Sequence, residues 1–228
     1  MKQAPLLLIS LHADPTQPSG ALEGGGTHAY LRELATGLAM RGQSCHIATR
    51  RQSSDLSPEV RVSPLTTLHR ISIGPPGALD KRLLNEFHHQ TIAELERLIM
   101  RLPVQPRLLH SVYWNSGRAA MTLSQSLGLP FVHTVISNGR GRRLRGASGN
   151  ARDREQVENQ VFNSAICLFC ISEAEKRDLI ELYGVDSGKI RVIGRPVEPV
   201  FLSPAHNELG HPRRHWNSIG DLMDGESI

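Results

Sequence analysis

A triple glycine at positions 24–26 is the first feature of this sequence that could do chemistry. It follows an apolar run at residues 6–11 and directly precedes a helix-patterned segment at residues 27–41. Glycine lets the backbone approach a ligand closely, and the first amides of a helix present unpaired N–H groups with a partial positive charge. The order of strand, glycine turn and helix therefore predicts a site for an anion such as phosphate. The spacing differs from the dinucleotide pattern G-x-G-x-x-G, and a flexible loop explains it equally well.

A short segment rich in arginine and glycine, residues 139–146, offers positive charge to the same kind of ligand. It holds four arginines in eight residues, although the formal net charge of the whole chain is only +4. Such a segment can bind RNA, but this one lacks the interleaved aromatic side chains on which bases stack. We interpret it as a basic loop for a phosphorylated ligand and predict no nucleic-acid partner.

The three cysteines do not form a pattern typical of redox or metal chemistry. Cys167 and Cys170 have C-x-x-C spacing, but they lie in an apolar run that predicts a buried strand, where residues three apart face opposite sides. We therefore interpret them as packing residues and predict no metal site. An odd number of cysteines also argues against a disulfide framework and fits a reducing compartment.

Composition and hydropathy place the chain among ordinary globular proteins. Its 228 residues are 39% hydrophobic and 21% charged, as expected for one large α/β domain or two small ones. No apolar run approaches the roughly 18 residues of a membrane span, and the first apolar run is too short for a signal peptide. We predict a cytoplasmic protein without a transmembrane segment.

Apolar runs alternate along the chain with amphipathic segments of helical length. The predicted strands are residues 6–11, 45–49, 69–73, 107–112, 130–135, 166–171 and 190–193, and the predicted helices are residues 27–41, 79–101, 116–127, 150–164 and 172–183. The last helix has a capping box, in which Ser172 and Glu175 bond each other's backbone amides, and Gly184 ends it. The alternation predicts an α/β fold, a Rossmann-like parallel sheet flanked by helices, with ligands at the carboxyl ends of the strands.

The alternation stops after Phe201. Residues 202–228 are polar, contain Pro204 and Pro212, and show no periodic apolar face. We predict one domain over residues 1–201, and a polar tail or truncated linker over residues 202–228.

Three runs carry a resemblance to a known family. They are residues 25–35 (GGTHAYLRELA), residues 109–117 (LHSVYWNSG), and residues 171–180 (ISEAEKRDLI) followed by residues 189–193 (KIRVI). In this order they resemble the amino-terminal half of the family 4 retaining glycosyltransferases, in the branch of sucrose-phosphate synthase and the inositol-phosphate glycosyltransferases. The resemblance covers nearly all of residues 5–201.

The resemblance implies the amino-terminal half of a GT-B fold, whose first domain mainly holds the acceptor and whose second holds the nucleotide-sugar. That second, carboxyl-terminal domain needs about 150 further residues, so we expect it to be absent here; a separate chain that supplies it and a truncated chain that lacks it both stay open. The expected reaction transfers a sugar from a nucleotide-sugar to an anionic or sugar-phosphate acceptor with retention of configuration. No cofactor and no metal are expected, because the glycine turn, a helix dipole and arginines can meet the diphosphate charge.

The resemblance also assigns site residues position by position. Gly25, Gly26 and Arg140 match positions that bind the donor phosphate. The matching acceptor-binding positions are His28, Lys81, Tyr113, His133, Thr134, Ser137, Arg154 and Glu158. The family histidine that contacts the transferred sugar is Ile136 here, so no catalytic residue is assigned.

Simpler interpretations stay open for several of these positions. Lys81 is equally well explained as a solvated lysine at the start of a helix. Arg154 and Glu158, four residues apart, could form an ordinary surface pair. His133 lies on a predicted strand and is better explained as a core histidine.

Two other functions compete with a glycosyltransferase. The missing second domain, Ile136 and the unpatterned tail favour a truncated or degenerate homologue that acts only as a binding module. A nicotinamide- or flavin-binding protein is disfavoured by the glycine spacing, and by Thr49, Arg50 and Arg51 where such proteins carry an acidic residue.

Overall fold

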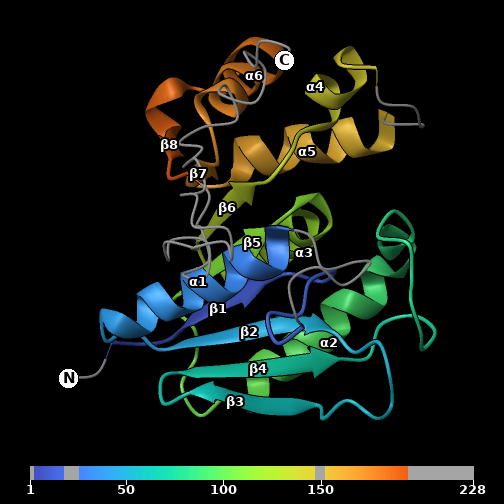
Figure 1. The fold of residues 1–228 in the computed structure, drawn as a ribbon, viewed down its shortest axis with the longest axis vertical. Helices are drawn as coiled ribbons and strands as arrows, with labels where there is room; N and C mark the ends of the chain where they lie inside the picture. Colours follow the sequence, from blue (N-terminus) through green and yellow to red (C-terminus); the bar gives the residue numbers. More distant parts are fainter. Residues whose placement is uncertain (1–2, 18–25, 147–151, 195–228) are drawn as a thin grey trace, which may run out of the picture. The chain divides into compact units, whose positions relative to one another are not determined.

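One mostly parallel sheet forms the centre of the molecule. The computed structural model describes residues 3–17, 26–146 and 152–194. Within them, eight strands lie in the order β3-β4-β2-β1-β5-β6-β7-β8 (Figure 1). The parallel strands are β1 (Leu6–Ile9), β2 (Cys45–Arg50), β4 (Thr66–Ile71), β5 (Leu108–Val112), β6 (Phe131–Val135), β7 (Cys167–Cys170) and β8 (Ile190–Val192). The edge strand β3 (Glu59–Ser63) runs antiparallel to β4.

The order of the strands reverses beside β1. From β1 the chain proceeds to β2, β3 and β4 on one side, and it then returns to β5 on the other side. β1 pairs with both neighbours, so that Ile9 lies opposite Ala48 of β2 and Ser111 of β5. In open parallel sheets, ligands bind beyond the carboxyl ends of the strands at such a switch point.

Helices cover both faces of the sheet. They are α1 (Gly26–Met40), α2 (His88–Arg101), α3 (Trp114–Leu127), α4 (Gly139–Leu144), α5 (Arg152–Ser164) and α6 (Glu173–Tyr183), with short 3-10 helices η1 (Leu83–Phe87) and η2 (Ser187–Lys189). Leu6 and Leu8 of β1 pack toward α1, whereas Leu7 and Ile9 pack with α2 and α3 on the opposite face. Because successive side chains of a strand point to opposite faces, β1 needs a continuous apolar sequence and is buried throughout.

The signals at the ends of α6 are partly confirmed. Ser172 Oγ accepts a hydrogen bond from the Glu175 amide at 3.1 Å, and Gly184 ends the helix with φ of +68°. The reciprocal half of the capping box is wrong, because the Glu175 carboxylate accepts from Asn138 Nδ2 at 2.9 Å instead. A tertiary contact has replaced a local one.

The sequence patterns predict all the described strands and α-helices except β3 and α4. β3 is an exposed edge strand with charged residues, so it carries no apolar run. The prediction of a basic loop at residues 139–146 is wrong, because Asn138 Oδ1 caps α4 by accepting from the Gly141 amide at 2.6 Å. The predicted helix at residues 79–101 forms only from η1 onward.

The predicted domain limit falls outside the described residues. Met1–Pro196 is one compact unit of the chain. The boundary predicted at residue 201, the predicted tail, and glycines 24 and 25 all lie in the parts that are not described. None of the described helices is long and apolar enough to cross a membrane.

Candidate functional site

Tyr113 stands at the switch point, between the end of β5 and the start of α3. Its φ of +73° is the one positive value at a non-glycine residue in the described ranges. Such a conformation costs about 1–3 kcal/mol and persists only where the surroundings enforce it. The Tyr113 amide donates to the Thr134 carbonyl at 3.2 Å, and the side chain is buried. The fold therefore holds the Tyr113 ring at the carboxyl edge of the sheet.

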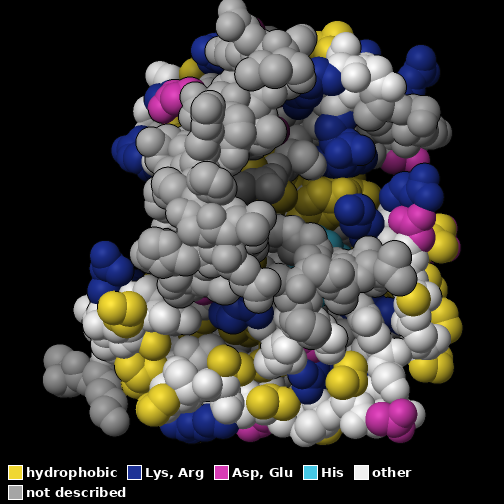
Figure 2. Space-filling model, in the orientation of Figure 1, with side chains coloured by type: hydrophobic (Ala, Val, Ile, Leu, Met, Phe, Trp, Pro, Cys, Tyr) yellow, Lys and Arg dark blue, Asp and Glu magenta, His cyan; other side chains and the backbone are white. Residues whose placement is uncertain are grey.

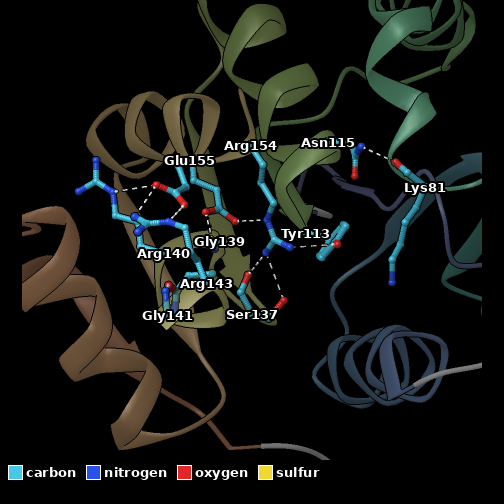
Figure 3. Close-up of polar contacts among 12 residues, drawn as sticks. Lys81, Tyr113, Asn115, Ser137, Gly139, Arg140, Gly141, Arg143, Arg154 and Glu155 are labelled. Atoms are coloured by element: carbon cyan, nitrogen blue, oxygen red, sulfur yellow. Dashed lines mark hydrogen bonds and ion pairs between the residues drawn. The ribbon is translucent and has the colours of Figure 1, made fainter. Parts of the chain in front are cut away.

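Two cationic side chains from distant segments meet at this ring. Lys81 Nζ lies 5.4 Å from the ring centroid and the Arg154 guanidinium lies 5.1 Å from it. Arg154 Nη1 also donates to the Tyr113 hydroxyl at 3.4 Å, and Nη2 donates to the carbonyl and hydroxyl of Ser137 at 2.6 and 3.2 Å (Figure 3). Lys81 is exposed and forms no ion pair within the described part of the chain. The structure thus brings together four of the predicted acceptor-binding residues.

Glu158 lies beneath Arg154 and is only 1% exposed. Its Oε1 accepts from Arg154 Nε at 2.7 Å, and its Oε2 accepts from the Gly139 amide at 2.7 Å and from the Tyr183 hydroxyl. Burial and the Glu158 carboxylate raise the pKa of the Tyr183 hydroxyl. The pair of Arg154 and Glu158 expected from their spacing is present, but it is buried rather than on a solvated surface. In this geometry Glu158 orients Arg154; its predicted contact with an acceptor stays a prediction.

Two histidines, His12 after β1 and His28 in the first turn of α1, lie near each other, and His12 contacts the Tyr113 ring. The His12 and Tyr113 ring centroids are 4.6 Å apart. Burial, followed by the nearby Lys81 and His28, lowers the pKa of His12 to about 3. His28 Nδ1 lies 2.8 Å from the Asp14 carbonyl, which can only accept, so Nδ1 carries the proton. The His28 Nε2 atom is buried and has no hydrogen-bond partner in the described ranges.

Four buried side-chain atoms have no hydrogen-bond partner, and all lie at the carboxyl ends of β1 and β5 or in the helices that follow. Within residues 3–17, 26–146 and 152–194 they are Ser10 Oγ, His12 Nδ1, His28 Nε2 and Asn115 Oδ1. Buried polar atoms in folded proteins almost always have a partner. Their concentration at one place marks it as a site for another polar molecule.

Two of the three arginines of α4, Arg140 and Arg143, are engaged by other helices. Arg140 lies 4.5 Å from the Tyr183 ring centroid, 3.9 Å from Glu155 Oε2, and donates to the Leu182 carbonyl. Arg143 donates to both Glu155 oxygens, at 2.7 and 3.1 Å. On the face seen in Figure 2, Lys and Arg side chains gather over the part that α4 and α5 occupy in Figure 1. Arg140 and Arg143 thus pair with Glu155, whereas Arg154 pairs with Glu158, and Arg140 as a donor-phosphate ligand stays a prediction.

The side chains of His133 and Thr134 on β6 are buried and are bonded to other residues of the protein. His133 is 1% exposed, and its Nδ1 lies 2.8 Å from Ser111 Oγ. Thr134 Oγ1 is hydrogen-bonded to the Tyr30 hydroxyl at 2.9 Å and to His110 Nε2 at 2.8 Å. Ile136 packs against an apolar cluster at the start of α1. These contacts favour the interpretation of His133 as a core histidine. Ligand contacts of His133 and Thr134 stay predictions.

The donor side of the predicted site is described only in part. Gly26 is the exposed first residue of α1, while Gly25 lies outside the described residues. His12 and Asn115 are two residues of this region that were not predicted from the sequence. Each lies three residues after the end of a strand at the switch point. This position in the sequence is the feature from which a role in the site could have been predicted.

Comparison with solved structures gives the class of protein. Sucrose-phosphate synthase from Thermosynechococcus elongatus superposes with a TM-score of 0.80 at 25% identity, over 89% of this chain and 51% of that one. The fold is therefore the Rossmann-like half of a GT-B glycosyltransferase. Within the described residues, no group of three or more His, Cys, Asp or Glu side chains could hold a metal ion.

Sequence comparison gives the family. The chain belongs to the Glycosyl transferase 4-like domain family, whose profile matches residues 25–196. It is 34% identical over 86% of its length to the D-inositol 3-phosphate glycosyltransferase of Arthrobacter sp. strain FB24, and 33% identical over 89% to that of Gordonia bronchialis. It spans about half of these relatives, 48% and 45% of their lengths.

Proposed function

We propose that this chain is the acceptor-side half of a glycosyltransferase that transfers a sugar from a nucleotide-sugar to a phosphorylated sugar or cyclitol. The observation that carries the proposal is the convergence of Lys81 and Arg154 on the Tyr113 ring at the switch point. The names of the sequence relatives, which act on inositol 3-phosphate, support a phosphorylated acceptor.

Lys81 and Arg154 would bind a phosphate in different ways. Lys81 supplies a mobile ammonium with three donors, and Arg154 supplies a guanidinium whose direction is fixed by Glu158 and Ser137. Each charge-assisted hydrogen bond to a phosphate contributes about 1.5–3 kcal/mol. The unpartnered His28 Nε2 lies in the first turn of the helix that follows β1, and a hydroxyl of the acceptor, which can both donate and accept, would satisfy it.

The donor diphosphate would approach the N-terminus of α1, where Gly26 leaves the first amides accessible. In the family this chemistry proceeds with retention, the donor phosphate helps to take the acceptor proton, and the protein supplies positioning and charge stabilisation. We propose that a second domain, on another chain or a longer form of this one, completes the nucleotide-sugar site. No cofactor or metal enters this scheme, and the cytoplasmic location stays a prediction.

A non-catalytic binding module is the second candidate. Ile136 favours it, because the corresponding family position holds a histidine near the transferred sugar. Both candidates require the phosphate site, and only the enzyme requires turnover once the second half is present. We expect the chain alone to show no sugar transfer; transfer by the purified chain would contradict the half-site proposal.

Titration calorimetry with inositol 3-phosphate tests the phosphate site directly. We expect binding in the micromolar to millimolar range that weakens as salt rises, and about a 10- to 100-fold loss of affinity in Lys81→Met. The matched control is Arg97→Met, which removes one charge from α2 where Arg97 pairs with Glu94 of the same helix. The proposal fails if the native chain does not bind, or if both variants bind like the native chain.

A further inference from the structure

Asn115 is a buried polar side chain to which neither sequence nor family assigns a role. It lies in the first turn of α3 and is 3% exposed. Its backbone is held in place, because the neighbouring Ser116 Oγ accepts from the Leu11 amide at 3.1 Å and so ties α3 to the end of β1. The side chain therefore sits on a rigid element beside Tyr113.

The orientation of the Asn115 amide is fixed by one hydrogen bond. Asn115 Nδ2 lies 2.8 Å from the Lys81 carbonyl, and because a carbonyl can only accept, the nitrogen must face it. The oxygen then points away from Lys81 O, toward the side of the Tyr113 ring and the Lys81 side chain (Figure 3). This Oδ1 is one of the four buried atoms without a partner in the described ranges.

An unpartnered amide oxygen at this place selects the chemistry of its ligand. Oδ1 accepts hydrogen bonds and cannot donate, and a phosphate oxygen brought against it would be repelled. A group that carries O–H satisfies it. A site that hydrogen-bonds a substrate hydroxyl strongly rejects an analogue that lacks the hydroxyl, because the buried acceptor is then left unpaired.

We propose that Asn115 is a specificity-determining residue that accepts a hydrogen bond from a hydroxyl next to the phosphate held by Lys81 and Arg154. The inference rests on the proposed function, since it needs the phosphate to occupy the Tyr113 edge. It restricts the ligands to polyhydroxylated phosphates, such as cyclitol or sugar phosphates, and disfavours phosphates on plain hydrocarbon rings.

The test compares two ligands that share a six-membered ring and a phosphate, inositol 3-phosphate and cyclohexyl phosphate. Titration of the native chain should give at least about a tenfold preference for the inositol phosphate. In Asn115→Leu this preference should fall close to one, mainly through weaker binding of the inositol phosphate. If Asn115 only positions Lys81, Asn115→Leu weakens both ligands equally and the preference stays, which overturns the proposal.

A second variant separates the two roles of the side chain. Asn115→Asp keeps an acceptor oxygen but loses the donor to the Lys81 carbonyl, so both ligands should bind more weakly while the preference remains. Loss of the preference in Asn115→Asp would also overturn the proposal. If the native chain binds neither phosphate, the proposed function itself fails; if it binds both equally, only the role of Asn115 fails.

Discussion

Two polar regions meet at Arg154, and they are built in opposite ways. On one side, after the carboxyl ends of β1 and β5, four buried side-chain atoms of the described residues have no partner. On the other, around Glu158, the carboxylate receives donors from Arg154, Gly139 and Tyr183. The first region is incomplete without a ligand or water, whereas the second is complete by itself. The contrast separates residues that bind from residues that hold the binding residues in place.

The density of charge in the sequence does not reveal this difference. The four arginines of residues 139–146 are the most conspicuous cations of the chain, yet three of them are paired: Arg140 and Arg143 with Glu155, and Arg145 with Asp178. Lys81, which lies outside this cluster, has no ion pair in the described part and faces the Tyr113 ring. A cation is available to a ligand only when the fold does not already neutralise it.

The strongest test of the comparison is Glu158→Ala. Removing this carboxylate leaves Arg154, the Gly139 amide and the Tyr183 hydroxyl without their acceptor, and breaking a buried ion pair in this way costs about 3–5 kcal/mol. We expect the free energy of unfolding, measured by urea denaturation, to fall by that amount. Glu94→Ala, which breaks the exposed pair with Arg97, is the control and should cost about 0.2–1 kcal/mol. Equal losses in the two variants would mean that the Glu158 region is not a structural centre.

Acid should destabilise the strands beneath the Tyr113 region. Burial lowers the pKa of His110 to about 4, and the side chain bonds Thr134 as a neutral ring. The unfolded chain takes up this proton near pH 6.5 and the folded chain only near 4, so stability falls as the pH drops through this window. The loss from His110 alone is about 2 kcal/mol between pH 6.5 and 5. Urea denaturation across this range should show a smaller pH dependence in His110→Gln, and identical slopes would refute the assignment.

The smallest expected effect is at Ser10, where a substitution should keep or raise stability rather than lower it. Ser10, directly after β1, and Ser111 of the neighbouring β5 are both fully buried, but Ser10 Oγ has no partner, whereas Ser111 Oγ bonds His133 Nδ1 at 2.8 Å. Ser10→Ala removes an unsatisfied hydroxyl and should leave stability unchanged or raise it by up to about 1 kcal/mol. Ser111→Ala should lower stability by about 1 kcal/mol. A loss at Ser10 as large as at Ser111 would show that Ser10 has a partner in the folded protein.

The sequence predicts the sheet well, because each buried strand can be identified from its own residues alone. Each buried parallel strand is an apolar run and each long helix has its own periodic face, whereas β3 is exposed and α4 depends on a cap from Asn138. The candidate site is harder to predict from the sequence, because it depends on contacts between residues that are far apart along the chain. Lys81, Tyr113 and Arg154 were identified through the resemblance, but the role of Glu158 and the free oxygen of Asn115 depend on contacts with Gly139, Tyr183 and Lys81 that form only in the folded chain.

The backbone conformation of Tyr113 bears on engineering of the chain. At φ of +73° glycine adopts the backbone conformation without strain, whereas other residues are strained. Glycine at position 113 would release about 1–3 kcal/mol of backbone strain, but it would also remove a buried aromatic ring, a loss that costs about 3–5 kcal/mol in a protein core. Such a variant would lose both this packing and the aromatic surface on which Lys81 and Arg154 meet. The backbone at this position thus favours glycine, whereas packing and ligand recognition both favour the aromatic residue.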